Sequence, residues 1–193
     1  MTRIIAGVAG GRRIAVPEGR TTRPTSDRVR EALFASVLSD LGSLAGLRVL
    51  DLYAGSGAIG LEALSRGAEH ALLVEADRRA AAVIRRNIVR TGLSGARLVV
   101  DRVERVVERG PDGGPYDLVV ADPPYAVGEQ EVTAVLAALR GRGWLAAGAL
   151  VVVERSSRGD TLRWPDGYLE AKSRKYGEAR LWYGHAASLS DQG

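Results

Sequence analysis

The chain has 193 residues, of which 46% are hydrophobic and none is cysteine. This length suits one well-cored domain with a short extension, since single domains usually span roughly 100–200 residues. A disulfide framework is excluded, and with only His70 and His185 available we expect no metal site. No apolar run approaches the ~20 residues of a membrane span, and the N-terminus lacks the apolar core of a signal peptide. We therefore expect a cytoplasmic protein that does not contact a membrane.

The charge distribution points to a polyanionic partner. The net charge is +4 and the isoelectric point is about 9.7. Seven arginines but only three acidic residues lie within the first 31 positions, so this basic arm is the candidate RNA contact. The alternative is a solvated basic surface without a ligand. The arginines assigned to RNA binding are Arg3, Arg12, Arg13, Arg20, Arg23 and Arg30.

Residues 1–22 are predicted to form a short N-terminal β-hairpin and basic arm. Two β segments, 3–6 and 12–16, flank a glycine-rich turn. After Pro24, Thr25 or Ser26 can cap a helix whose apolar residues recur at helical spacing. The resulting stripe, which we expect to pack on the main core, is Val29, Leu33, Phe34, Val37, Leu38 and Leu41.

From Leu47 onward, short apolar runs alternate with helical segments, a pattern typical of a parallel sheet covered on both faces. The expected strands span residues 48–52, 71–75, 97–100, 116–121 and 149–154, and the expected helices span residues 58–66, 78–91, 101–109 and 129–140. Right-handed crossovers then give a doubly wound α/β sheet. Residues 168–173 and 179–183 add a closing antiparallel hairpin. We expect the domain to cover residues 23–185 and a flexible tail to cover 186–193.

A glycine-rich loop follows the first of these strands and opens a helix, which is where an open α/β sheet binds its ligand. Gly55, Gly57 and Gly60 match the dinucleotide-binding fingerprint, although a tight turn without a ligand would also use glycine. Asp51 would repel a pyrophosphate but attract the α-ammonium group of S-adenosylmethionine, directly or through water. The alternative for Asp51 is a helix-capping role. Glu75, at the end of the next strand, is placed to accept hydrogen bonds from ribose hydroxyls.

The sequence Asp122-Pro123-Pro124-Tyr125, after the apolar run 118–121, indicates the chemistry. Prolines fix φ and have no N–H, so the Pro123 carbonyl can point into a cleft. Together with the Asp122 side chain it offers two acceptors to an exocyclic amino group, and Tyr125 can stack on a flipped base. Methyl transfer from a sulfonium needs alignment in a dry site and no covalent intermediate. We predict that these four residues are catalytic; a proline-rich turn is the alternative.

Taken in order, the glycine loop, Glu75 and residues 122–125 resemble those of class I amino-group methyltransferases. Segments 3–7, 11–13 and 23–34 are similar to the N-terminal signature of the bacterial 16S ribosomal RNA guanine-N2-methyltransferases of the D family. The resemblance covers nearly the whole chain. It implies a Rossmann-like sheet of seven strands, mostly parallel, with an antiparallel C-terminal hairpin. It also implies methylation of the 2-amino group of guanine 966 of 16S rRNA, in assembled or nearly assembled small subunits. We expect a monomer.

The same resemblance implies the cofactor contacts. The glycine loop and the end of the second strand would bind S-adenosylmethionine, the segment around Thr25 and Arg28 would cover its amino-acid end, and the arginine-rich hairpin would grip RNA. This chain departs from the family after the third strand, where Val103 and Glu104 replace the usual small polar or acidic residue and alanine, so we assign the adenine contact to the backbone of Arg102 or Val103. The predicted contacts are Thr25, Arg28, Asp51, Tyr53, Ala54, Gly55, Ser56, Gly57, Glu75, Ala76, Arg102 and Val103.

Four other functions use some of these motifs. A DNA adenine amino-methyltransferase usually carries a sizeable target-recognition segment, for which fewer than 70 residues after Tyr125 leave little room. A protein glutamine methyltransferase would have Asn in place of Asp122. A nicotinamide oxidoreductase would need a proton-transfer residue in its cleft. A non-catalytic RNA-binding module would be expected to have lost Asp122 or the loop glycines.

Overall fold

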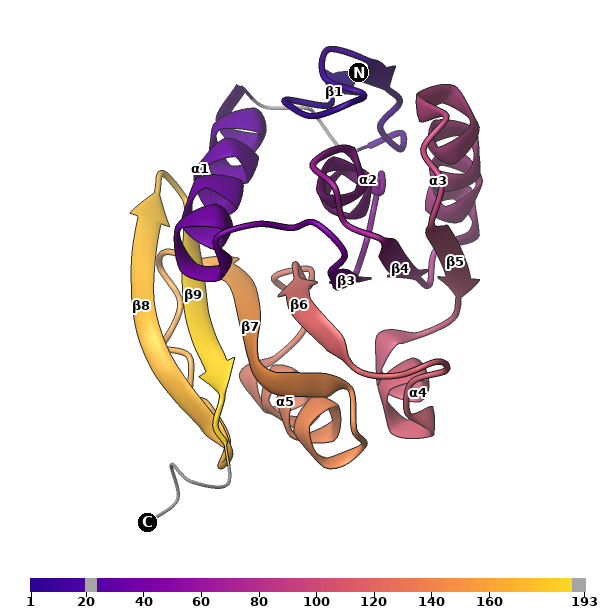
Figure 1. The fold of residues 1–193 in the computed structure, drawn as a ribbon. Coiled ribbons are helices and arrows are strands. Elements are labelled where there is room, and N and C mark those ends of the chain that lie inside the picture. Colours follow the sequence, from indigo (N-terminus) through magenta and orange to yellow (C-terminus); the bar gives the residue numbers. More distant parts are fainter. Residues whose placement is uncertain (20–23, 189–193) are drawn as a thin grey trace.

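The computed structural model describes residues 1–19 and 24–188, and its centre is a seven-stranded sheet with the order β5-β4-β3-β6-β7-β9-β8 (Figure 1). Strands β3 to β7 are parallel, whereas β9 runs antiparallel to both of its neighbours. This arrangement confirms the predicted fold class. The strands are β3 (Arg48–Leu52), β4 (His70–Glu75), β5 (Ala96–Val100), β6 (Tyr116–Ala121), β7 (Leu145–Ser156), β8 (Tyr168–Tyr176) and β9 (Ala179–Ala186).

Helices cover both faces of the sheet (Figure 1). On one face lie α1 (Pro24–Leu41), α2 (Ala58–Ser65) and α3 (Arg78–Thr91), and on the other lie α4 (Val103–Arg109) and α5 (Glu129–Gly141). Successive strand residues point to opposite faces, so Val49 joins the core under α1, α2 and α3, whereas Leu50 joins the core under α4 and α5. Burial on both faces explains why these strands are continuous apolar runs.

Local signals fix the limits of α3. The Asp77 side chain accepts hydrogen bonds from the N–H groups of Arg79 and Ala80, at 2.7 and 3.1 Å. At the other end Gly92 takes a left-handed conformation with φ of 65°, which suits glycine. The predicted range of this helix is therefore confirmed.

The N-terminal hairpin is shorter than predicted. Its strands are only β1 (Thr2–Arg3) and β2 (Arg13–Ile14), and the residues between them form turns that also bond to α2. The Val8 N–H donates to the Ser65 carbonyl at 2.8 Å. Gly7 has φ of 83°, and a Cβ atom there would lie 1.9 Å from the Ser65 carbonyl oxygen. The hairpin is thus packed onto the domain.

Several predicted boundaries move by a few residues. Helix α1 begins at Pro24 instead of after a Thr25 or Ser26 cap, since proline suits the first helical position. Helix α4 begins at Val103, because the Asp101 carboxylate accepts the Arg102 N–H at 2.8 Å ahead of the helix. Strand β7 extends over residues 145–156, at both ends beyond the predicted strand.

The predicted tail begins too early. Strand β9 runs to Ala186, and the Ala187 N–H donates to the Gly167 carbonyl at 2.8 Å. The Arg140 guanidinium also donates to the Ala187 carbonyl, at 3.0 Å. Ordered contacts therefore pass the predicted boundary at residue 185. Within the described residues, no helix is both long and apolar enough to cross a lipid bilayer.

Candidate active site

A cavity of about 770 Å³ opens beyond the carboxyl ends of β3 and β6. These strands are neighbours, but the chain leaves β3 toward β4 and leaves β6 toward β7 on the opposite side. Such a switch point is the usual ligand site of an open α/β sheet. The loop after β3 and the motif after β6 both line the cavity, together with Val16 and Pro17 of the N-terminal segment, the start of α1 and the β8–β9 turn.

A second cavity of about 330 Å³ adjoins the first. Tyr53 and Pro124 line both, so the two cavities are neighbours separated by these side chains. The second is lined by the end of β4 and the start of α4, which includes Glu75, Arg102 and Val103. Sequence analysis assigned these three residues to the cofactor, and the fold brings them together.

The glycine loop is held in a strained shape. Tyr53 has φ of 58°, an uncommon conformation for a residue with a side chain, and such strain is concentrated at ligand sites. The Glu75 carboxylate accepts the Gly55 N–H at 2.7 Å through Oε1 and the Asp77 N–H at 2.9 Å through Oε2. Each oxygen keeps a second lone pair, and Glu75 lines the second cavity. Glu75 can therefore fix the loop and still accept hydrogen bonds from ribose hydroxyls.

Asp51 is 2% exposed and lines neither cavity. Its carboxylate accepts the Gly60 N–H at 3.0 Å and so anchors the first turn of α2. Burial raises the pKa of Asp51 well above its usual range, and the nearby Asp122 and Glu75 raise it further. A direct contact with an α-ammonium group does not fit this position, which leaves the predicted contact through water and the capping alternative.

The sequence motif of residues 122–125 stands at the mouth of the first cavity. Asp122 and Tyr125 are exposed, Tyr125 by 54%, while Pro123 is buried beneath them. The Asp122 N–H donates to the Leu52 carbonyl at 3.3 Å, which ties the motif to the neighbouring strand β3. The Asp122 carboxylate and the exposed ring of Tyr125 thus lie next to the glycine loop.

Arg155 donates hydrogen bonds to this motif and to the residues that follow it, a role that sequence analysis missed. It is 6% exposed, and its guanidinium donates to the carbonyls of Pro124 and Val127 at 3.4 and 2.7 Å and to the Glu129 carboxylate at 2.9 Å. A forked guanidinium can serve several acceptors at once, so Arg155 fixes the path of the chain from the motif into α5. The sequence signal for this role was the position of Arg155, a charged residue at the end of an apolar strand.

The cavity-lining residues that sequence analysis missed include Glu154, Tyr176 and Glu178. Val120 pairs with Val152 across β6 and β7, so Asp122 and Glu154, each two residues further on, lie on the same face of adjacent strands. Burial, with the charge of Asp122, raises the pKa of Glu154 from 4.5 to about 8. The sequence offered one signal for Glu154: its carboxylate directly follows an apolar run, as the carboxylate of Asp122 does.

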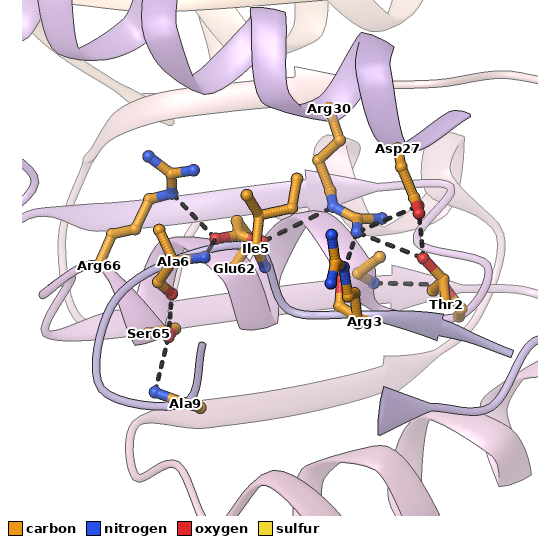
Figure 2. A network of polar contacts seen from close by, with 12 residues as sticks. Thr2, Arg3, Ile5, Ala6, Ala9, Asp27, Arg30, Glu62, Ser65 and Arg66 are labelled. Atoms are coloured by element: carbon orange, nitrogen blue, oxygen red, sulfur yellow. Dashed lines mark hydrogen bonds and ion pairs between the residues drawn. The ribbon is translucent and has the colours of Figure 1, made fainter. Parts of the chain in front are cut away.

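Figure 2 shows the polar network that joins the N-terminal hairpin to α2. The fully buried Glu62 carboxylate accepts the N–H groups of Ile5 and Ala6, at 2.7 and 3.1 Å, and pairs with Arg66 at 2.9 Å. Arg30 lies 3.7 Å from the same carboxylate and donates to the Arg3 carbonyl. Burial lowers the pKa of Arg30, against the opposing effects of Asp27 and Glu62. Arg30 is 6% exposed and lines the first cavity, so these contacts give it a structural role, and its assignment to RNA binding stays a prediction.

The other predicted arginines have different environments. Arg3, Arg12 and Arg13 are exposed, and Arg12 also donates to the Thr91 carbonyl at the end of α3. Arg28 is exposed and lines neither cavity, so the predicted cover over the cofactor's amino-acid end is not found at that residue. Arg20, Arg23 and the side chain of Thr25 lie outside the described residues. Sequence analysis did not count the exposed arginines of α3, which are Arg78, Arg79, Arg85, Arg86 and Arg90.

Comparisons with known proteins agree with this geometry. Ribosomal RNA small subunit methyltransferase D of Escherichia coli (strain K12) is 41% identical over 155 residues, which are 79% of this chain and 73% of that protein. A family model described as conserved hypothetical protein 95 matches residues 2–185. The chain belongs to this methyltransferase family. The methyltransferase D of Haemophilus influenzae is 34% identical over 154 residues, covering 79% of this chain and 77% of that one.

Two solved structures share the fold of this chain over nearly their whole length. The Escherichia coli protein YhhF superposes with a TM-score of 0.84 at 31% identity, covering 96% of this chain and 98% of that chain. The Thermus thermophilus protein TTHA0928 has a TM-score of 0.77 at 34% identity, covering 95% and 98%. Family membership supports the predicted cofactor, S-adenosylmethionine, and a ribosomal RNA substrate.

Proposed function

We propose that this protein transfers a methyl group from S-adenosylmethionine to the exocyclic 2-amino group of a guanine in 16S ribosomal RNA. By family resemblance the target is nucleotide 966, in assembled or nearly assembled small subunits, and the enzyme acts as a cytoplasmic monomer. The observation that carries the proposal is that Asp122 and Tyr125 line the same cavity as the strained glycine loop.

The two cavities suit the two halves of S-adenosylmethionine, which supplies an activated methyl group when bound. In the second cavity, Glu75 would bind the ribose hydroxyls, and Ala76 with the backbone of Arg102 and Val103 would border the adenine. The residues assigned to the amino-acid half are Tyr53, Ala54, Gly55 and Ser56, which line the first cavity. Asp51 and Gly57 would act indirectly, by shaping the turn into α2.

The motif residues would orient the amino group. Asp122 accepts one N–H and the Pro123 carbonyl accepts the other, so the nitrogen lone pair faces the cofactor side of the cavity. Tyr125 stacks on the flipped base, and Pro124 with the Arg155 guanidinium keeps the motif rigid. Positioning in a dry site accounts for most of the acceleration, and Asp122 is placed to accept the proton that the amine loses.

The RNA would lie over the N-terminal hairpin. Arg3, Arg12 and Arg13 are exposed there, and β2 packs beside the arginine-rich helix α3. That helix contains five arginines and no acidic residue, so its positive charge is uncompensated along its own length. Arg20 and Arg23 remain part of this proposal.

The test is methyl transfer from labelled S-adenosylmethionine to three substrates in parallel: small subunits lacking the modification, protein-free 16S rRNA, and duplex DNA. The products are digested to nucleosides and identified. N2-methylguanosine from subunits, with little product from DNA, is the expected result. Methyladenine from DNA would keep the fold and cofactor but overturn the substrate.

A further inference from the structure

Glu154 stands in the first cavity without an assigned role. It lies near the end of β7, one strand away from Asp122, and its side chain points to the same face of the sheet. No hydrogen bond or ion pair joins its carboxyl group to another residue within 1–19 or 24–188. Because Glu154 lines the cavity, a ligand bound there can provide a hydrogen-bond donor to its carboxyl group.

We propose that Glu154 determines base specificity by accepting the N1–H of the target guanine. The inference rests on the proposed function, because it places the amino group of the base on Asp122 and the Pro123 carbonyl. When Asp122 and the Pro123 carbonyl hold the amino group and Tyr125 stacks on the ring, the edge of the base that carries N1 faces the neighbouring strand, β7. Glu154 is the carboxyl group that this strand presents to the cavity.

The ring atom beside the amino group differs among the bases. In guanine the 2-amino group lies between N1–H, a donor, and N3, an acceptor, and the inference places the N1–H side toward β7. In adenine and cytosine the amino group lies between a carbon and a ring nitrogen that only accepts. An ionised carboxylate at this position attracts the first arrangement and repels the second. A protonated carboxyl group also favours guanine, because its carbonyl accepts N1–H while its O–H donates to O6.

The electrostatics of the cavity agree with this assignment. Asp122 and burial both disfavour the charged form of Glu154, so its pKa rises to about 8 in the free protein. The other ionisable groups lining the cavity include Arg30 and Asp27 of α1, which pair with each other at 3.4 Å, and Glu178 and Tyr176 from the β8–β9 hairpin. A base whose edge presents hydrogen-bond donors supplies what the Glu154 carboxyl group lacks, and guanine presents more donors there than adenine or cytosine.

The experiment uses 16S rRNA with either guanine or 2-aminopurine at the target nucleotide, assembled into small subunits. 2-Aminopurine keeps the reactive amino group but has an acceptor in place of N1–H. The enzymes are the wild type, Glu154→Leu, Glu154→Gln, and the control Glu170→Leu, an exposed β8 residue outside both cavities. The value of kcat/KM is measured for each pair, with cofactor affinity by calorimetry and Tm as checks on folding.

We expect Glu154→Leu to lower kcat/KM on guanine by about 10- to 100-fold, as for loss of a charge-assisted hydrogen bond, and on 2-aminopurine by less than about 3-fold. Glu154→Gln, whose amide can also pair with N1–H and O6, should recover most of the guanine activity. Glu170→Leu should leave kcat/KM unchanged on both substrates. Should Glu154→Leu not fold, Glu154→Ala takes its place.

Two results would overturn the inference. Equal losses on both bases, with N2-methylguanosine still the wild-type product, would make Glu154 a structural residue and leave the proposed function standing. Wild-type methylation of adenine instead of guanine would overturn the inference and the proposed function together, and nucleoside analysis distinguishes the two cases.

Discussion

The side chain of Asn87 pairs with the main chain of Ala15 in both directions: its oxygen accepts the Ala15 N–H at 2.8 Å, and its nitrogen donates to the Ala15 carbonyl at 2.9 Å. The same nitrogen donates to the Ser56 carbonyl at 2.9 Å. One fully buried amide in α3 therefore joins the N-terminal arm to the glycine loop. This contact links the proposed RNA-binding segment to the proposed cofactor site.

Replacing Asn87 by alanine should weaken both segments. Three backbone groups would lose their partner, at about 1–3 kcal/mol for each group left buried, so Tm should fall by several degrees. Because Ser56 lines the cavity, cofactor affinity should fall about 5- to 10-fold. Calorimetry and thermal unfolding give both values, with the exposed α3 residue Arg86→Ala as control. A lower Tm with full cofactor affinity would confine Asn87 to a structural role.

Arg155→Lys should separate positioning from charge. Lysine keeps the charge but cannot reach the Pro124, Val127 and Glu129 acceptors together, so the motif should lose its rigid path into α5. We expect kcat to fall about 10-fold, with cofactor affinity within about 2-fold. Steady-state kinetics and calorimetry test this, and Arg158→Lys in the exposed turn that follows is the matched control. An unchanged kcat would show that the motif does not need this support.

Asp122→Ala should remove methyl transfer while sparing the cofactor. The side chain faces the proposed base site, so we expect turnover to drop by at least about 100-fold and cofactor affinity to stay within a few fold. Single-turnover assays and calorimetry separate the two effects. Asp160→Ala, at an exposed turn, controls for loss of a carboxylate. Turnover at the wild-type rate would exclude Asp122 from the reaction.

The RNA surface is best probed at Arg13, because Arg12 also contacts the Thr91 carbonyl. Arg13→Glu should weaken RNA binding and flatten its dependence on salt, since each phosphate contact adds about one to the slope of log K against log salt. Filter binding over a range of salt concentrations measures the slope. The control is Arg163→Glu, an exposed residue whose neighbour Leu162 packs in the core under α4 and α5. If both variants had the wild-type slope, the RNA site would lie elsewhere.

Stability should depend on pH through Glu154. Its pKa is raised by burial and Asp122 to about 8 in the folded protein, against 4.5 when exposed. Between these values the folded state holds the proton more tightly, so this group's contribution is fully present below pH 4.5 and is lost as pH rises to 8. Glutamine does not ionise, so Glu154→Gln does not lose this stability as pH rises. The Tm of the variant minus the Tm of the wild type should therefore increase by at least roughly 2–4 °C from pH 5 to pH 8. A pH-independent difference would contradict the raised pKa.

The sequence by itself determined the order of the elements and the two motifs. Periodicity fixed α3 and strands β3 and β6 to the residue, because burial on one or both faces leaves a regular apolar pattern. The glycine loop and residues 122–125 were found because their chemistry requires particular residues at consecutive positions. Strand order then brought them together at the switch point.

Only the tertiary structure decided what individual charged residues do. Arg13 and Arg30 belong to the same basic segment, yet one is exposed and the other is buried against Glu62, because α1 and α2 close around the latter. Glu154 and Asp122 are 32 positions apart, and their proximity comes from the pairing of β6 with β7. Local sequence specifies helices, strands and turns, whereas the surroundings of a charge depend on residues distant in the chain, and those surroundings fix its burial, its pKa and its partners.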